Sequence, residues 1–144
     1  MGTIITARDF SMNIALGVLK PIIYCGSFPE IDRNAISLNK TLAEKLLECR
    51  PSRRTMKVEG IFNEIISLLP EEAVIKDFDV LFNPAYKIDV LKIMINACRH
   101  KKFGVLWPGR YENGKLFYAE EGFEDYKSFI IEDYDITCVI EGGK

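Results

Sequence analysis

The stretch FGVLWPGRYENGKLFYAEEGFEDY, residues 103–126, decides the fold of this chain. It opens as an apolar run that ends at Trp107, the only tryptophan, and Pro108 and Gly109 follow directly. Because proline cannot donate to a strand ladder and glycine permits a chain reversal, the strand predicted over residues 103–107 must end abruptly.

Downstream of that strand, Asn113-Gly114 predicts a β-hairpin that joins residues 110–112 to residues 115–118. Arg110 and Tyr111 are thereby delivered to the end of the preceding strand. Open α/β sheets tend to carry their binding sites at the carboxyl ends of their strands, so this is the first place to look for function.

Working outward, strand-like segments alternate with helix-like ones. Further strands are predicted over residues 21–25, 35–39, 73–82 and 135–141. Helices are predicted over residues 10–19, 41–49 and 58–69. A fourth helix is predicted from the apolar stripe Ile88, Leu91 and Ile95, and it ends at residues 99–102. Thr41 and Glu44 form a candidate capping box for the second helix. This alternation predicts a single α/β domain over residues 1–144, with a mainly parallel sheet flanked by helices and the hairpin as an ornament.

Composition is that of a globular protein: 144 residues, 48% hydrophobic and 28% charged, with a net charge of −2 that argues against phosphate binding by the whole surface. No two of the four cysteines (Cys25, Cys49, Cys98 and Cys138) are spaced as a metal-binding pair, so we expect reduced, mostly buried thiols in a cytoplasmic protein. The apolar stretch 10–25 is interrupted by Lys20-Pro21 and is too short to span a bilayer, so no membrane segment is expected.

Two acids carry the first candidate chemistry. Asp77 and Asp79 are two apart on the predicted strand, share one face, and could hold Mg²⁺ through water; the alternative is a solvated strand edge. Phosphate loops of the GxxxxGK[ST] or GxGxxG type are absent from the sequence, and Cys25-Gly26-Ser27 is predicted to be a simple turn.

Aromatic and basic residues supply the other candidates. Trp107, Arg110, Tyr111 and Tyr118 could form a stacking platform for a base or a partner, or else a packed hairpin. The basic loop Arg50, Arg53 and Arg54 could contact a phosphate or an acidic partner, or be merely solvated. His100, the only histidine, is interpreted as a helix-end residue, and no zinc site is expected.

Three blocks of the chain resemble BrxF, the small P-loop protein of BREX bacteriophage-exclusion systems. They are residues 36–39 with the helix 41–49, residues 76–84, and the specific string W-P-G-R-Y at 107–111 that continues through Leu116 and residues 118–120. The resemblance implies a trimmed P-loop-NTPase-like α/β domain that acts with larger defence-system proteins, and a family that binds nucleoside triphosphates such as ATP with Mg²⁺.

The chain departs from that family pattern at two places. Residues 22–39 contain no Walker A loop, and about eight residues separate Gly26 from the next predicted strand, fewer than the roughly 10–12 that a helical crossover needs, so the phosphate-binding helix is predicted to be missing. The second departure is at the metal-binding acid of the family. In one alignment register Lys76 takes the position of this acid and Asp79 falls near the second acid. In a register shifted by one, Asp77 takes the position instead, and both registers stay open.

Three functional hypotheses follow. The leading one is a noncatalytic, degenerate P-loop-like protein that works through protein partners in phage defence, with Trp107, Arg110, Tyr111 and Tyr118 as the binding residues. The alternative is a nucleotide-binding or hydrolysing ATPase with an atypical phosphate loop, in which Asp77 or Asp79 holds the metal and Arg110 contacts phosphate. A nucleic-acid-binding module built on the aromatic platform together with Arg53, Arg54, Lys101 and Lys102 ranks last because the chain is acidic overall.

Overall fold

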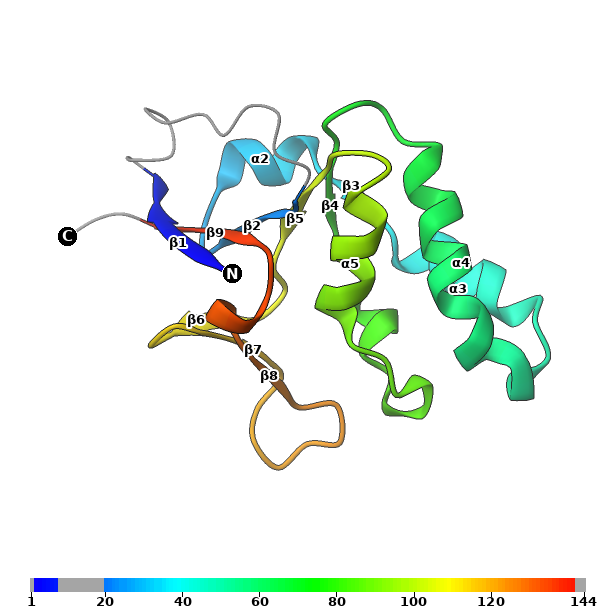
Figure 1. Ribbon diagram of the computed structural model, residues 1–144. Helices are drawn as coiled ribbons and strands as arrows, with labels where there is room; N and C mark the ends of the chain where they lie inside the picture. The colour runs from blue at the N-terminus through cyan, green and yellow to red at the C-terminus, as the bar shows by residue number, and fades with distance from the viewer. Residues whose placement is uncertain (1, 8–19, 142–144) are drawn as a thin grey trace.

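A computed structural model describes residues 2–7 and 20–141, and the helix predicted over residues 10–19 lies outside these residues. Six strands form a parallel sheet in the order β1-β9-β2-β5-β4-β3 (Figure 1). Their bounds are β1 (Thr3–Thr6), β9 (Thr137–Ile140), β2 (Ile22–Cys25), β5 (Gly104–Leu106), β4 (Val74–Lys76) and β3 (Ile36–Ser37). The predicted α/β class with a mainly parallel sheet is confirmed.

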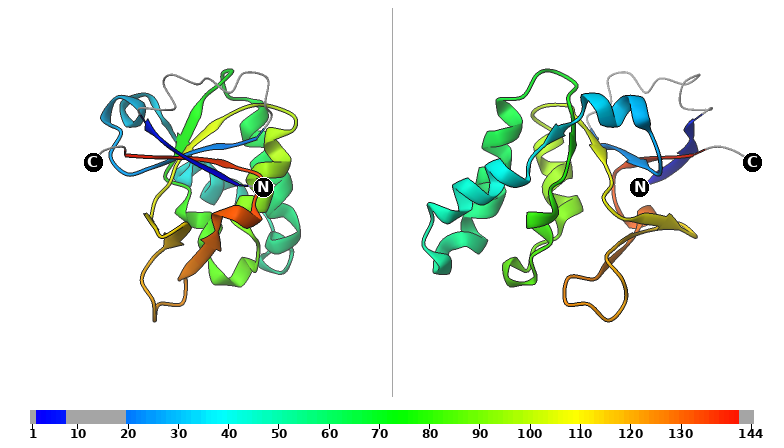
Figure 2. Two further views of the ribbon diagram at one scale, coloured as in Figure 1. Left: turned by 60° about the vertical axis from the view of Figure 1, so that its left-hand side comes forward. Right: turned by 180° about the vertical axis from the view of Figure 1, so that it is seen from behind.

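Helices cover the sheet on both sides. They are α2 (Pro29–Asn34), α3 (Asn39–Leu47), α4 (Arg54–Ser67) and α5 (Val90–Cys98), with short 3₁₀ helices η1 (Pro51–Arg53), η2 (Asp79–Phe82), η3 (Pro84–Tyr86) and η4 (Ile131–Asp133). Seen along the sheet, α2 lies on one side and α5 on the other (Figure 2). Buried parallel strands need cover on both faces, so this layering follows from the apolar strands.

The connections that leave the neighbouring strands β2 and β5 run in opposite directions across the sheet. The connection after β2 crosses β5 and β4 to reach β3 at the edge, and the connection after β5 crosses β2 to reach β9. In open α/β sheets, ligands bind beyond the carboxyl ends of the strands at such a switch point. The segments after β2 and β5 are therefore the topologically favoured place for a site.

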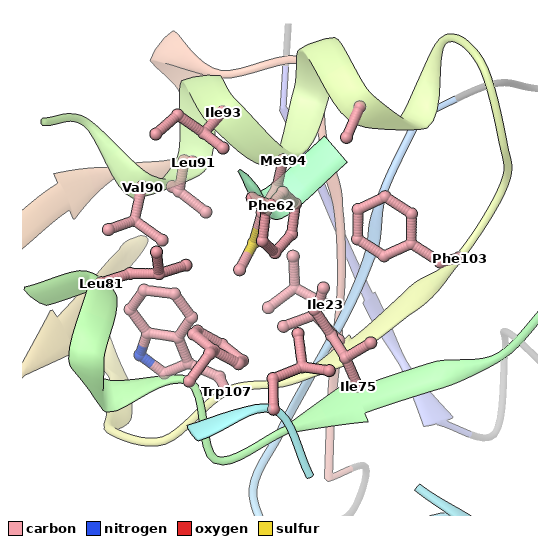
Figure 3. Packing of buried hydrophobic residues seen from close by; sticks show 14 of the residues in the cluster. Ile23, Phe62, Ile75, Leu81, Val90, Leu91, Ile93, Met94, Phe103 and Trp107 are labelled. Carbon is pink, nitrogen blue, oxygen red and sulfur yellow. The ribbon is translucent and has the colours of Figure 1, made fainter. Parts of the chain in front are cut away.

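The main core lies between the sheet and helices α4 and α5. Ile23 and Ile75 from the strands contact a layer formed by Phe62 of α4 and Met94 of α5, and all four side chains are fully buried (Figure 3). The β-branched strand residues and the long helix residues fill this layer as expected for a buried parallel sheet.

The hairpin is part of a second sheet rather than an ornament. Strands β6 (Arg110–Glu112), β7 (Lys115–Tyr118) and β8 (Lys127–Ile130) form an antiparallel sheet with β7 in the centre. Its inner residues Leu116 and Phe129 are buried in the same core cluster as the main sheet. The hairpin prediction is confirmed, but β8 was not predicted, and the sheet is anchored to the domain.

Several predicted boundaries are wrong for identifiable reasons. The strand predicted over 73–82 ends at Lys76, because Asp77 has a left-handed φ of 52° and residues 79–82 then turn into η2. Helix α3 begins at Asn39 with Leu38 as N-cap, so the predicted capping box at Thr41 is wrong. The connection after Gly26 was predicted to be too short for a helical crossover, and this prediction is wrong: the six-residue α2 fits into it.

Candidate functional site

The turn after β2 is the place where a phosphate loop would lie. Gly26 has a φ of 116°, and a Cβ at this position would lie 2.6 Å from Oε1 of Glu141, the residue that follows β9. Helix α2 then begins with Pro29, which has no N–H, and its N-cap Phe28 makes no side-chain hydrogen bond. The turn therefore presents a carboxylate where a phosphate would need hydrogen-bond donors.

Lys76, at the end of β4, is engaged by α2. Its Nζ lies 2.6 Å from Oδ1 and 3.2 Å from the backbone oxygen of Asp32. The hydrogen bond to Asp32 is the main cause that raises the pKa of Lys76. Lys76 thus links β4 to α2, while Asp77 is exposed in the left-handed turn beyond it.

Asp79 lies at the start of η2 and joins three elements. Its Oδ1 accepts a hydrogen bond from Nδ2 of Asn39 at 3.3 Å, and its Oδ2 accepts one from the hydroxyl of Tyr118 at 2.8 Å. The Asn39 side chain also accepts from the backbone N–H of Val80 at 3.0 Å. Both carboxylate oxygens of Asp79 therefore hold α3, η2 and β7 together.

The same contact affects the titration of Tyr118. Burial raises the pKa of its hydroxyl, and the hydrogen bond to Asp79 and the charge of that carboxylate raise it further. The hydroxyl accordingly stays a proton donor to Asp79 across the physiological range.

The prediction that Asp77 and Asp79 share one face of a strand is wrong. Strand geometry would have placed residues two apart on one face, but the left-handed turn at Asp77 ends the strand before Asp79. Within residues 2–7 and 20–141, no group of three or more histidine, cysteine or acidic side chains is placed to hold a metal ion.

Trp107 is buried at the junction of the two sheets, with 6% of its surface exposed (Figure 3). Its indole Nε1 donates to the backbone oxygen of Phe117 in β7 at 2.9 Å, and its ring packs edge-on against Phe82 and Phe129 with centroids 5.7 Å apart in both cases. Trp107 therefore connects the sheets and offers little surface to a partner.

Tyr118 belongs to this junction as well. Its ring stacks on Phe82 with the centroids 3.8 Å apart and an interplanar angle of 5°. Tyr111 is partly buried and packs against the core. The predicted platform of Trp107, Arg110, Tyr111 and Tyr118 is thus divided: the aromatic members pack inward, and only Arg110 is exposed.

The face of the second sheet that points away from the core carries a different set of side chains. We call this face the outer face. Strand alternation and register place Arg110, Glu112, Lys115, Phe117, Ser128 and Ile130 there. The Arg110 guanidinium lies 4.5 Å from the centre of the Phe117 ring, and its Nη1 donates to Glu120 Oε2 at 3.1 Å. The role of Phe117 was missed, although the Asn-Gly turn fixes its pairing with Arg110.

Two of the basic residues considered for nucleic acid binding have structural roles. Arg54 Nε donates to the backbone oxygens of Leu46 at 2.9 Å and Cys49 at 3.3 Å, and Lys101 Nζ donates to those of Ser67 and Leu69. These bonds satisfy carbonyls at the ends of α3 and α4. Arg54 and Lys101 are therefore both engaged within the protein.

Comparison with protein-family models, with curated proteins and with solved structures gives no match for this chain. None of the helices in the described part of the chain has the length and apolar character needed to cross a membrane. Function is therefore inferred from the geometry of the sheet edge and the outer face, together with the sequence resemblance.

Proposed function

We propose that the protein is a noncatalytic, degenerate P-loop-like protein that acts through protein partners in cytoplasmic bacteriophage defence, as the resemblance to BrxF implies. The parallel sheet with its switch point at β2 and β5 supports a relation to nucleotide-binding α/β folds. The chemistry at that switch point supports the loss of nucleotide binding.

The observation that carries the proposal is the Glu141 carboxylate beside the Gly26 turn. A phosphate oxygen about 4 Å from a carboxylate is repelled by about 1 kcal/mol in bulk water and by about 4 kcal/mol near a protein surface. The nearby cation Lys76 already pairs with Asp32, and both oxygens of Asp79 accept hydrogen bonds within the protein. These internal contacts support a structural role for the edge residues.

The outer face supports the partner-binding half of the proposal. Arginine and aromatic residues are enriched at the energetic centres of protein interfaces, and Arg110 stacked on Phe117 presents both on a rigid sheet. Ile130 adds an apolar side chain that is 49% exposed. Trp107 beneath this sheet limits its movement, which reduces the entropy cost of binding.

The catalytic alternative is tested by calorimetry and thermal melting with ATP and GTP, with and without Mg²⁺. We expect no heat and no thermal stabilisation at millimolar nucleotide. Mg²⁺-dependent binding that Asp79→Ala weakens would replace this proposal with an ATPase that uses an atypical phosphate loop.

The partner-binding half is tested by co-expressing the protein with the products of its neighbouring genes and measuring co-purification. Arg110→Ala together with Phe117→Ala should lower the affinity for a captured partner about tenfold or more. Lys92→Ala on the exposed side of α5 is the matched control and should leave capture unchanged. Equal capture of the partner by the wild type, the double variant and the control variant would refute the role of the outer face.

A further inference from the structure

The tip of the α3–α4 helical hairpin, residues 47–57, exposes two large apolar side chains. Leu47 is 70% exposed and Met56 is 73% exposed. Leu47 ends α3 and Met56 lies in the first turn of α4, so the short connection between the helices keeps them on the same end of the hairpin. Two large apolar side chains exposed at one end of a helical hairpin are candidates for contact with a partner.

The same tip is strongly basic. Arg50, Arg53 and Lys57 are exposed, and none of the three makes an ion pair or a side-chain hydrogen bond to any part of the chain that the structure describes. Glu48 is the only acid in residues 47–57, whereas the chain as a whole carries a net charge of −2. The tip is therefore a local positive surface on an acidic protein.

Internal bonds fix the shape of the tip. Arg54 Nε donates to carbonyls at the end of α3, including that of Leu46 at 2.9 Å. Further along the hairpin, Lys45 of α3 pairs with Glu64 of α4 at 3.7 Å. Pro51 restricts the backbone of the turn at the start of η1. A surface held in this way loses little entropy when a partner binds.

We propose that this tip is a docking surface for an acidic protein segment that carries apolar side chains. The cations attract the acidic residues, and Leu47 and Met56 take up the apolar ones. Phosphate backbones would use the cations alone and leave both apolar side chains in water, so a protein segment fits the tip better than a nucleic acid does. The surface is independent of the outer face, because the two lie on different sides of the molecule (Figures 1 and 2).

The proposal is tested on the full chain by amide NMR and fluorescence anisotropy with a designed peptide of four Glu-Asp-Leu repeats. We expect its titration to shift amide signals from residues 47–57. A peptide of four Glu-Asp-Ser repeats carries the same charge without apolar groups and should bind about tenfold more weakly. Equal binding of the two peptides, or no shift at millimolar peptide, would overturn the proposal.

Variants separate the apolar contribution to peptide binding from the electrostatic one. Leu47→Ser with Met56→Ser should lower the affinity for the Glu-Asp-Leu peptide about tenfold. Arg50→Glu with Arg53→Glu should remove most of the salt dependence of that binding. Leu68→Ser is the apolar control, because Leu68 is 77% exposed at the far end of α4, and Lys40→Glu is the charge control at the start of α3. Tighter binding of a twelve-nucleotide oligo-dT than of the Glu-Asp-Leu peptide would assign the tip to nucleic acid and refute the proposal.

Discussion

The bond between Tyr118 and Asp79 is expected to stabilise the junction of the two sheets measurably. Tyr118→Phe removes the hydroxyl that lies 2.8 Å from Asp79 Oδ2 and keeps the ring that stacks on Phe82. A hydrogen bond to a charged group contributes about 1.5–3 kcal/mol, and the exposed position of Asp79 favours the lower end or less. We therefore expect a loss of about 1 kcal/mol of unfolding free energy, or roughly 3 °C in Tm.

A double-mutant cycle isolates this contact. Tyr118→Phe, Asp79→Ala and the double variant are compared with the wild type by urea unfolding, and a coupling energy of about 1 kcal/mol is expected. Asp79→Ala alone should cost more than Tyr118→Phe, because it also removes the bond from Asn39 at 3.3 Å.

The control for this cycle is Tyr111→Phe, a tyrosine of the same sheet that packs against the core. It should change the unfolding free energy by less than about 0.5 kcal/mol. A coupling energy below about 0.3 kcal/mol for Tyr118 and Asp79 would show that their bond does not stabilise the junction. In that case Asp79 would again be a candidate metal ligand.

Two further predictions concern alkaline pH and a close backbone approach. Folding raises the pKa of the Tyr118 and Tyr134 hydroxyls through burial and through hydrogen bonds to Asp79 and Asp89. The two hydroxyls therefore contribute fully to the free energy of unfolding below their unfolded-state pKa of about 10. This contribution is lost as the pH rises towards their folded-state pKa. Urea unfolding from about pH 8 to 11 should show a steeper loss for the wild type than for Tyr118→Phe with Tyr134→Phe, and parallel curves would contradict this reasoning. Gly109→Ala should lower the free energy of unfolding by several kcal/mol, because a Cβ there would lie 1.7 Å from the Phe117 backbone oxygen. The control is Gly60→Ala in α4, where a Cβ meets nothing within 4 Å, and it should raise the free energy of unfolding by about 0.5–1 kcal/mol. Equal Tm values for the two variants would refute the steric argument.

Local sequence signals predicted the parts of the fold that depend on local chemistry. The Asn113-Gly114 turn has both residues at positive φ, 50° and 77°, and it joins β6 and β7 as predicted. The strands around residues 21–25 and 103–107 were found because each is a short apolar run that ends at glycine or proline. These features need no knowledge of distant contacts.

The missed features depend on contacts between distant residues. Residues 73–82 contain enough apolar side chains for a long strand, but Phe78, Leu81 and Phe82 are all buried against the core, and that spacing suits a turn and a 3₁₀ helix. The partners of Asp79 lie 40 and 39 residues away in the sequence, at Asn39 and Tyr118. No local pattern could show that this acid is already engaged within the protein.

The central strand of the second sheet links the two surfaces that matter for the proposed function. In β7, the backbone oxygen of Phe117 accepts a hydrogen bond from Trp107, the residue that follows β5. The hydroxyl of the next residue, Tyr118, donates to Asp79 at the start of η2, beyond the end of β4. The Phe117 side chain meanwhile lies on the outer face beneath Arg110. A partner that binds this face therefore acts on a strand that is held from behind by the carboxyl edge of the main sheet. We therefore expect Asp79→Ala, which removes this contact, to weaken partner binding even though Asp79 lies outside the outer face, and co-purification of the partner with this variant measures the effect.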